Sequence, residues 1–235
     1  MRLELKSIKK EFVSRSGCRY NCLEDLNMVI ESGEFHLLYG ASGSGKTTLL
    51  NIMAGMLHPT SGQVLLDGRE IQNAKERELA LLRRRRFGYA MQSASLLSSL
   101  TVYENIALPL TFFVGTESPA KAMQVTKPQA TEEKATMQIE TQIESQLRKA
   151  GLWKVKDSYP AELSGGEYRR CTILRAFITG PDFLLADEPT ANLDDRNAEI
   201  IIEMLEELRK QGAAVVVATH DKRFADDSRR MWVLE

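Results

Sequence analysis

The stretch that most constrains this chain runs from residue 40 to residue 48 and reads GASGSGKTT. It satisfies the pattern G-x-x-x-x-G-K-[ST], whose glycines let backbone N–H groups close around phosphate oxygens that a Cβ atom would obstruct. A strand is predicted over 35–39 directly before it, and a helix over 48–56 directly after it. These flanks favour a phosphate-binding loop over a Gly/Ser-rich turn that fits the pattern by accident.

The residue types of this loop point to a nucleotide. Lys46 supplies a positive charge for the β- and γ-phosphates, and the Thr47 hydroxyl is the expected ligand of Mg²⁺. The helix that follows adds the partial positive charge of its N-terminus. Upstream, either Phe12 or Tyr20 could stack on adenine, and at least one of the two is an ordinary core or surface aromatic. The residues predicted to bind the phosphates are Gly40, Ala41, Ser42, Gly43, Ser44, Gly45, Lys46, Thr47 and Thr48.

Composition narrows the class of protein around this loop. With 235 residues, 43% of them hydrophobic, the chain can form one large α/β unit or two small domains. A net charge of -1 gives no global attraction to nucleic acid or to an anionic membrane, and no nucleic-acid partner is expected. Three cysteines without C-x-x-C spacing and three scattered histidines indicate neither disulfides nor zinc, so a reducing compartment fits best. The N-terminus is no apolar signal segment, and no apolar run approaches the length of about 18 residues that crosses a bilayer, which predicts a cytosolic chain unless something docks it elsewhere.

Alternating apolar and polar residues predict that the N-terminal part is rich in β structure. Half-exposed strands are expected over 2–9 and around 26–30. A further strand over 63–66 is followed by an Asp67-Gly68 turn, so another hairpin is expected to return to the same layer.

The middle of the chain mixes regular and irregular patterns. A helix is predicted over 76–86, and the four arginines at its end are interpreted as a solvated helix end rather than a site for nucleic acid or lipid head groups. An apolar strand over 87–92 follows and stops at a glutamine. Pro and Gly among polar residues over 114–134 predict a loop or an inserted segment. A capping-box pattern at 126–129 and a helical apolar stripe after it predict a helix that ends at Gly151 and packs in the core rather than on a partner.

The second half of the chain carries a second candidate anion site. Ser164, Gly165 and Gly166 precede a helix predicted over 168–177, and a hydroxyl, backbone donors and a helix dipole together attract anions. One nucleotide has no evident need of two such sites on one subunit.

Paired acids complete the pattern. The apolar strand predicted over 183–188 ends in Asp187 and Glu188, where the first carboxylate suits Mg²⁺ and the second can orient or deprotonate a water molecule. A buried strand over 213–218 ends close to His220, a side chain that could reach a γ-phosphate. Because the carboxyl ends of parallel strands share one edge of a sheet, these groups are expected to meet the phosphate-binding loop there.

These motifs, in this order and over nearly the whole chain, resemble the ATPase subunit of an ATP-binding cassette (ABC) transporter. The five residues Leu163 to Glu167 are the most specific part of the resemblance. It implies an α/β fold, namely a P-loop NTPase (RecA-like) core with an N-terminal antiparallel β layer and an inserted helical subdomain at about 93–162. The whole of 1–235 would form a single nucleotide-binding domain.

The resemblance also assigns roles by position. The catalytic residues that it implies are Lys46, Glu188 and His220, and the Mg²⁺ ligands that it implies are Thr47, Gln92 and Asp187, with Asp187 acting through water. The signature residues expected to contact nucleotide are Ser164, Gly165, Gly166 and Glu167. Phe12 matches the aromatic residue that stacks on adenine better than Tyr20, which stays the alternative.

Partners and location follow from the same resemblance. Two subunits would pack head to tail as a homodimer, with each ATP held between Lys46 of one and the signature of the other. The stretches 91–97, 100–110 and 187–194 resemble the bacterial branch of lipoprotein-releasing, macrolide-efflux and cell-division ATPases. Such a subunit powers a separate membrane permease with transmembrane helices, as an exporter or a force-transmitting machine, from the cytoplasmic face of the inner membrane.

Some features leave alternatives open. The main alternative is a non-transport ABC ATPase that regulates a membrane-bound cell-envelope complex; a soluble ATPase of DNA or ribosome maintenance and a binding-only subunit are less favoured. Glu167 stands where the family more often has glutamine, Tyr168 stands where a polar residue is usual, and the polar segment 114–134 is longer than is typical of this branch. The sequence names neither the transported molecule nor the permease.

Overall fold

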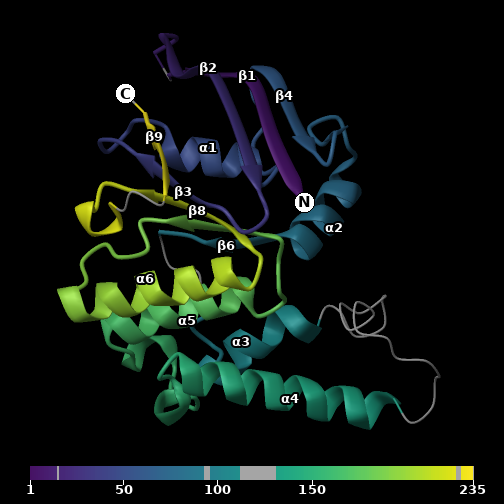
Figure 1. Ribbon diagram of the computed structural model, residues 1–235, viewed down its shortest axis with the longest axis vertical. Helices are drawn as coiled ribbons and strands as arrows, with labels where there is room; N and C mark the ends of the chain where they lie inside the picture. The colour runs from purple at the N-terminus through teal and green to yellow at the C-terminus, as the bar shows by residue number, and fades with distance from the viewer. Residues whose placement is uncertain (15, 93–95, 112–130, 226–228, 235) are drawn as a thin grey trace.

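In the computed structural model, two β-sheets and a group of helices form successive layers (Figure 1). The structure describes residues 1–235 except 15, 93–95, 112–130, 226–228 and 235. The predicted capping box at 126–129 and most of the polar segment 114–134 therefore lie outside the described residues.

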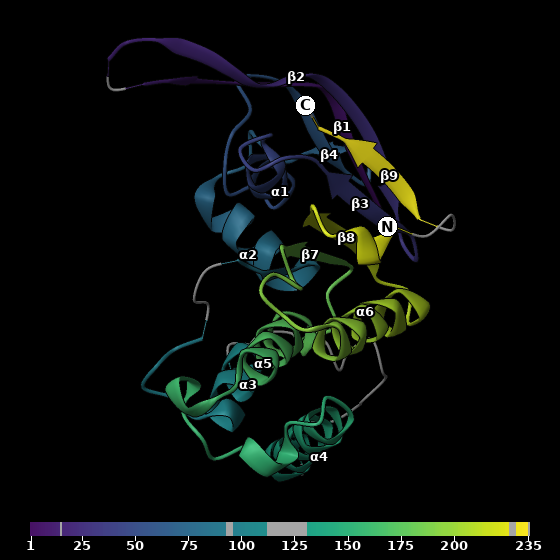
Figure 2. The same cartoon turned by 90° about the vertical axis from the view of Figure 1, so that its left-hand side faces the viewer.

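The first layer is an antiparallel sheet with the strand order β2-β1-β4-β5. Its strands are β1 (Arg2–Val13), β2 (Arg19–Glu31), β4 (Ser61–Leu66) and β5 (Arg69–Glu70). The predicted return of the third strand to this layer is confirmed, because β4 pairs with β1. β1 and β2 are longer than their alternating patterns predicted, and their shared hairpin extends well beyond the body of the molecule (Figure 2).

The second layer is a parallel sheet with the strand order β6-β7-β8-β3-β9. Its strands are β3 (Phe35–Tyr39), β6 (Phe87–Ala90), β7 (Phe183–Asp187), β8 (Ala214–Thr219) and β9 (Arg230–Val233). β7 and β8 are buried along their whole length, as continuous apolar runs in a parallel sheet must be. Between the two sheets lies α1 (Lys46–Met53), whose Leu49 and Leu50 join the core that both sheets share.

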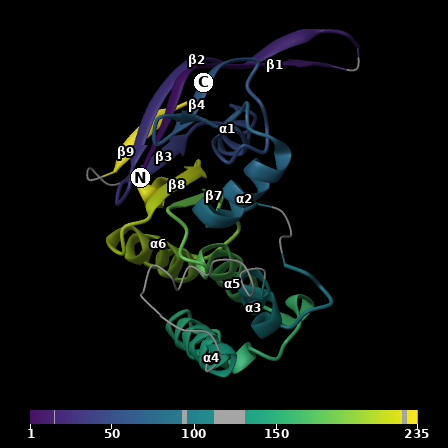
Figure 3. The same ribbon diagram turned by 90° about the vertical axis from the view of Figure 1, so that its right-hand side faces the viewer.

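The remaining helices are α2 (Glu76–Arg86), α3 (Val102–Thr111), α4 (Thr131–Lys149), α5 (Gly165–Phe177) and α6 (Asp195–Lys210), with short 3₁₀ turns η2 (Trp153–Val155), η3 (Pro160–Glu162) and η4 (Lys222–Phe224). α5 and α6 cover the other face of the parallel sheet, α3 and α4 lie beyond them, and α2 packs beside α1 in the core that both sheets share (Figures 1 and 3). α5 joins two cores, because Ile173 packs with the sheet and α6 whereas Cys171 and Leu174 pack with α3 and α4. The helical subdomain at about 93–162 stays a prediction, and α3 and α4 are the helices that it would contain.

The four arginines that end α2 are only in part a solvated helix end. Arg83 forms an ion pair with Glu76 and donates a hydrogen bond to the Gly55 carbonyl oxygen at 2.9 Å. Arg86 pairs with Asp182 at 2.8 Å, directly before β7. The run therefore also anchors α2 to the turn after α1 and to the start of β7. Within the described residues, no helix combines the length and the apolar character needed to cross a bilayer.

Candidate active site

The carboxyl ends of three neighbouring parallel strands bring the predicted site residues to one edge of the sheet. β3 leads into the loop 40–48, β7 ends in Asp187 and Glu188, and β8 leads to His220. The register sets Asp187 opposite Ala218 and Tyr39 opposite Thr219. The predicted meeting of these segments is therefore present in the fold.

The loop 40–48 has the backbone that its glycines predicted. Gly43 and Gly45 have φ angles of 86° and 89°, which side chains rarely tolerate. A Cβ at Gly45 would lie 2.8 Å from the Cys22 carbonyl oxygen, and one at Gly40 would collide with the Leu234 carbonyl oxygen. The loop is thus confined between β2 and the segment that follows β9.

Lys46 and Ser44 are polar groups held inside this loop. Lys46 is only 6% exposed, and its Nζ donates hydrogen bonds of 2.7 Å to the carbonyl oxygens of Gly40 and Ala41. The Ser44 hydroxyl is buried and has no hydrogen-bond partner among the described residues. α1 begins after Gly45 without a side-chain cap and with no acidic residue in its first turn. A buried cation, an unpartnered hydroxyl and an uncapped helix N-terminus together fit an anionic ligand such as a phosphate group.

Thr47 and Asp187 form a pair of oxygen groups beside the loop. The Thr47 hydroxyl donates a 2.7 Å hydrogen bond to Oδ2 of Asp187. Burial raises the pKa of Asp187 above the usual range of an aspartate, and the Thr47 hydrogen bond opposes that rise. A buried carboxylate next to a hydroxyl fits a hard cation such as Mg²⁺, which prefers oxygen ligands. Gln92 lies two residues beyond β6 and is exposed. Its backbone carbonyl oxygen accepts a 3.1 Å hydrogen bond from Arg169.

Glu188 and His220 form a second pair at the same edge. The Glu188 carboxylate is buried, and its Oε1 lies 2.8 Å from Nδ1 of His220, a side chain that is 69% exposed. Because a carboxylate only accepts hydrogen bonds, His220 Nδ1 carries a hydrogen and donates the hydrogen bond to Glu188. The Thr219 hydroxyl donates to the other Glu188 oxygen at 3.1 Å. Two donors thus orient one carboxylate at the rim of the sheet.

The second predicted anion site lies at the start of α5, which begins at Gly165 rather than at 168. Ser164 caps the helix, and the Glu167 carboxylate accepts hydrogen bonds from the Ser164 hydroxyl at 2.6 Å and from its backbone N–H at 2.9 Å. These bonds lower the pKa of Glu167. No hydrogen bond or ion pair of the described residues links 164–167 to the loop 40–48, so one copy of the chain presents the two sites separately.

The two candidate adenine-stacking rings face each other on the β1–β2 hairpin. Phe12 and Tyr20 are stacked with their ring centroids 5.8 Å apart, and Lys10 Nζ lies 5.1 Å above the Phe12 ring. Tyr20 is the more exposed of the two, at 56%. The choice between them stays a prediction.

Other residues join the site although their patterns did not predict it. The Cys22 thiol lies 3.5 Å from the Thr48 hydroxyl and lines the loop, and Thr219 orients Glu188. Cys22 had no local signal, because its place depends on how β2 crosses the loop. Thr219 adjoins His220, and only that proximity could have indicated it.

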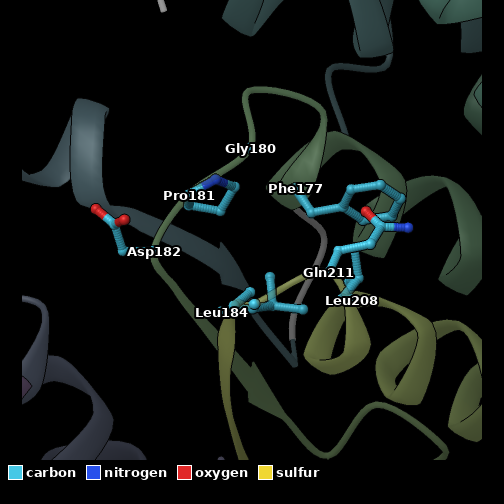
Figure 4. A pocket seen from close by; sticks show the side chains of 9 residues that line it. Phe177, Gly180, Pro181, Asp182, Leu184, Leu208 and Gln211 are labelled. Atoms are coloured by element: carbon cyan, nitrogen blue, oxygen red, sulfur yellow. The ribbon is translucent and has the colours of Figure 1, made fainter. Parts of the chain in front are cut away.

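A cavity between the start of β7 and the end of α6 lies at the opposite edge of the sheet (Figure 4). Phe177, Pro181, Asp182 and Leu208 are among the residues that line it. Since β7 and β8 begin there and end at the loop 40–48, this cavity is separate from the predicted nucleotide site.

Comparison with known proteins decides the family. Residues 23–191 match the family model described as ABC transporter. This chain belongs to the ABC transporter family. It is 37% identical to the bacitracin export ATP-binding protein BceA of Halalkalibacterium halodurans, over 93% of this chain and 79% of that protein. It is also 37% identical to the macrolide export ATP-binding/permease protein MacB of Campylobacter fetus, over 95% of this chain but only 32% of that longer protein.

Solved structures agree with this family assignment. A dimeric bacterial ABC transporter cassette, MJ0796, is 32% identical and superposes with a TM-score of 0.81 over 99% of this chain and 94% of that one. The same cassette in a dimeric post-hydrolysis state bound to ADP and Pi gives a TM-score of 0.83 at 31% identity, over 99% of this chain and 94% of that one. The predicted family and the predicted P-loop NTPase fold are therefore confirmed, and this ABC protein is an ATP-binding, ATP-hydrolysing subunit of a transporter.

Proposed function

We propose that this ABC ATPase powers an export transporter whose membrane-spanning permease is a separate chain. The relatives that support this are named for export, and the MacB proteins carry the words ATP-binding and permease in one name while this chain covers 32% of their length. The relative BceA, of which this chain covers 79%, is named as an ATP-binding protein without the word permease, and this supports a permease on a separate chain. The subunit would then act at the cytoplasmic face of the inner membrane as a peripheral protein.

We further propose that the working unit is a homodimer with two composite sites. The start of α5 and the loop 40–48 are separate anion sites in one copy, and a twofold axis would place the α5 start of one copy opposite the loop of the other. The similar cassette MJ0796 is dimeric in both of its structures. In this arrangement Ser164, Gly165, Gly166 and Glu167 would contact the nucleotide held by the partner subunit.

The residues of the loop would bind and orient the triphosphate. Lys46 would exchange its bonds to two loop carbonyls for the β- and γ-phosphates, and Ser44 would gain the partner that its hydroxyl lacks. Mg²⁺, held by Thr47 and Asp187 with Gln92 as a further ligand, would neutralise charge on the phosphate oxygens. Phe12, or Tyr20 in its place, would stack on adenine.

The placement of the Glu188 carboxylate is the observation that best supports the proposed hydrolysis. It is buried one residue beyond the proposed Mg²⁺ ligand Asp187, and two hydrogen-bond donors fix its orientation. A carboxylate so placed can accept a proton from a water molecule as that water attacks the γ-phosphate. His220, whose Nδ1 donates to Glu188, would keep the carboxylate in place and present its other nitrogen outward.

Replacing this carboxylate by its amide tests the proposal. Glu188→Gln is expected to bind ATP with nearly unchanged affinity, to lose turnover by at least about a hundredfold and to form an ATP-bound dimer on size exclusion. Glu203→Gln on the exposed face of α6 is the matched control and should behave as wild type. Normal turnover in Glu188→Gln would exclude Glu188 as the base, and a monomer with ATP and Mg²⁺ would count against the composite site.

The transporter partner needs a separate test. Crosslinking the tagged chain in its native cells, followed by purification from solubilised membranes and mass spectrometry, should recover a permease with transmembrane helices. Recovery of a membrane-bound cell-envelope enzyme complex would favour the regulatory alternative. Recovery of soluble partners alone would remove the export proposal and leave the ATPase assignment intact.

A further inference from the structure

Arg223 on η4 joins two segments that leave the proposed active site in different directions. Its guanidinium is bidentate on the Asp221 carboxylate, with Nε 3.0 Å from Oδ1 and Nη2 2.7 Å from Oδ2. Its Nη1 lies 2.9 Å from Oδ1 of Asp195 and donates to the Leu193 carbonyl oxygen at 3.4 Å. One side chain therefore ties the segment after His220 to the turn that follows Glu188.

Asp221 is also connected to that turn and to Glu188 by other bonds. The Thr190 hydroxyl, almost fully buried, donates a 2.6 Å hydrogen bond to Oδ2 of Asp221. The Asp221 backbone N–H donates to the Thr219 hydroxyl at 3.0 Å, and that hydroxyl donates to Glu188 at 3.1 Å. The Asp221 carboxylate therefore bonds to Arg223 on one side and to Thr190 of the turn after Glu188 on the other.

The turn that these bonds hold has an unfavourable backbone. Glu188 and Asn192 have φ angles of 46° and 60°, a left-handed conformation that L-residues with side chains seldom adopt. Such a conformation persists only where the surrounding structure determines it. The Glu188 N–H donates to the Ala218 carbonyl oxygen at 2.8 Å. At the far end of the turn the Leu193 side chain packs against the core of the sheet and α6, and its backbone is held by Arg223 and by the Thr190 carbonyl oxygen.

We propose that Arg223 is a positioning residue for ATP hydrolysis, which sets the place of the 188–195 turn relative to His220 by holding Asp221 and the Leu193 carbonyl together. This inference rests on the roles proposed above for Glu188 and His220. Arg223 itself contacts neither of them, so its effect passes through Asp221, Thr190 and Thr219.

The chemistry of the contact requires arginine. A planar guanidinium can bind both oxygens of a carboxylate and a carbonyl at the same time, whereas a lysine supplies one flexible point charge. The bond to Asp195 contributes little, because that side chain is 99% exposed and its charge is screened by solvent. The contacts to Asp221, which is only 15% exposed, and to Leu193 carry the function.

Steady-state kinetics of the full-length chain test this role, with rates expressed per titrated nucleotide-binding site. Arg223→Ala is expected to lower kcat by about tenfold or more and to change the affinity for ATP by less than about twofold, because a displaced turn disturbs the reacting geometry and not the loop 40–48. Arg223→Lys should recover part of the lost kcat. Arg209→Ala is the matched control, since Arg209 also bonds a carboxylate (Glu206, 2.8 Å) and a carbonyl (Gly33, 3.4 Å) but lies at the far end of α6.

A double-mutant cycle separates positioning from a general loss of stability. Asp221→Asn should also lower kcat, and adding Arg223→Ala to it should lower kcat by less than about twofold more, because both changes break the same connection. A kcat in Arg223→Ala equal to that of Arg209→Ala would overturn the proposal, and so would losses that simply multiply. Normal turnover in Glu188→Gln would instead overturn the role of Glu188, so the two failures are distinguishable.

Discussion

The N-termini of α1 and α5 are both sites that a sequence pattern predicts to bind phosphate, and the structure prepares them in opposite ways. α1 starts after Gly45 with a left-handed backbone, no side-chain cap and a buried lysine at its first position. α5 starts after Ser164 with a complete capping box, in which Glu167 occupies the hydroxyl and the backbone N–H of Ser164. The first site is open to a phosphate within one subunit, whereas at the second, in the proposed dimer, a nucleotide on the partner subunit would have to compete with Glu167 for Ser164.

Glycine and serine at a helix start therefore do not by themselves make an open anion site. What decides is whether a local carboxylate already satisfies the donors. At α1 the buried Ser44 hydroxyl lacks a partner among the described residues, so a ligand would supply a missing contact. At α5 a ligand must displace the existing hydrogen-bond partner of Ser164, which is Glu167.

The largest effect is expected at α1, from Lys46→Ala. This change removes the cation that would face the phosphates and leaves the carbonyl oxygens of Gly40 and Ala41 without their donor. Nucleotide affinity should fall by at least about a hundredfold, as for loss of one partner from a buried charged contact. Titration calorimetry with ATP measures it, with the exposed Lys149→Ala as control; unchanged affinity would remove the role given to the open site.

A smaller and different effect is expected at α5, from Gly166→Ala. A Cβ there would lie 2.6 Å from Cγ of Asn197, so the start of α5 must shift against α6. ATP affinity of the single subunit should stay within about twofold of wild type while turnover falls by about tenfold, because a shifted α5 start misplaces the residues proposed to contact the partner subunit's nucleotide. Gly165→Ala, whose Cβ would meet only Leu193 at an ordinary 3.7 Å, is the comparison for folding stability. Equal losses of affinity and turnover in Gly166→Ala would contradict the division of labour between the two helix starts.

The smallest effect is expected from Glu167→Gln, which removes the charge of the capping box and keeps its shape. At neutral pH the variant should be less stable by about 0.3 to 1 kcal/mol, the usual value of an acid near an exposed helix N-terminus. Because the hydrogen bonds from Ser164 lower the pKa of Glu167 below 4.5 in the folded state, its contribution is present above pH 4.5 and is lost as the pH falls through the lowered pKa. Chemical denaturation at several pH values should therefore show the stabilities of wild type and variant converging in acid, with Glu140→Gln in α4 as control. A pH-independent difference would assign the effect to packing and not to charge.

The elements themselves follow closely from local patterns. The predicted strand 35–39 and helix 76–86 have the bounds of β3 and α2. The predicted starts of α1 and α5 are too late, because glycines stand at or next to both starts (Gly45 and Gly165) and the preceding loops set where each helix begins. The strand expected over 87–92 ends at Ala90, which leaves Gln92 beyond the sheet.

The amino-acid sequence alone is enough to predict the family, the strands and helices that flank the motifs, and the chemistry available at each strand end. Those properties depend on residue types at short spacing, which a linear pattern retains. Three sets of contacts follow from the three-dimensional packing and not from local patterns: Thr47 with Asp187, His220 with Glu188, and Arg223 with Leu193 and Asp195. Such contacts join residues that are far apart in the chain, and their distances depend on how β3, β7 and β8 lie side by side in one sheet. Packing of buried strands fixes that order, because only the assembled core specifies which strand edges face each other.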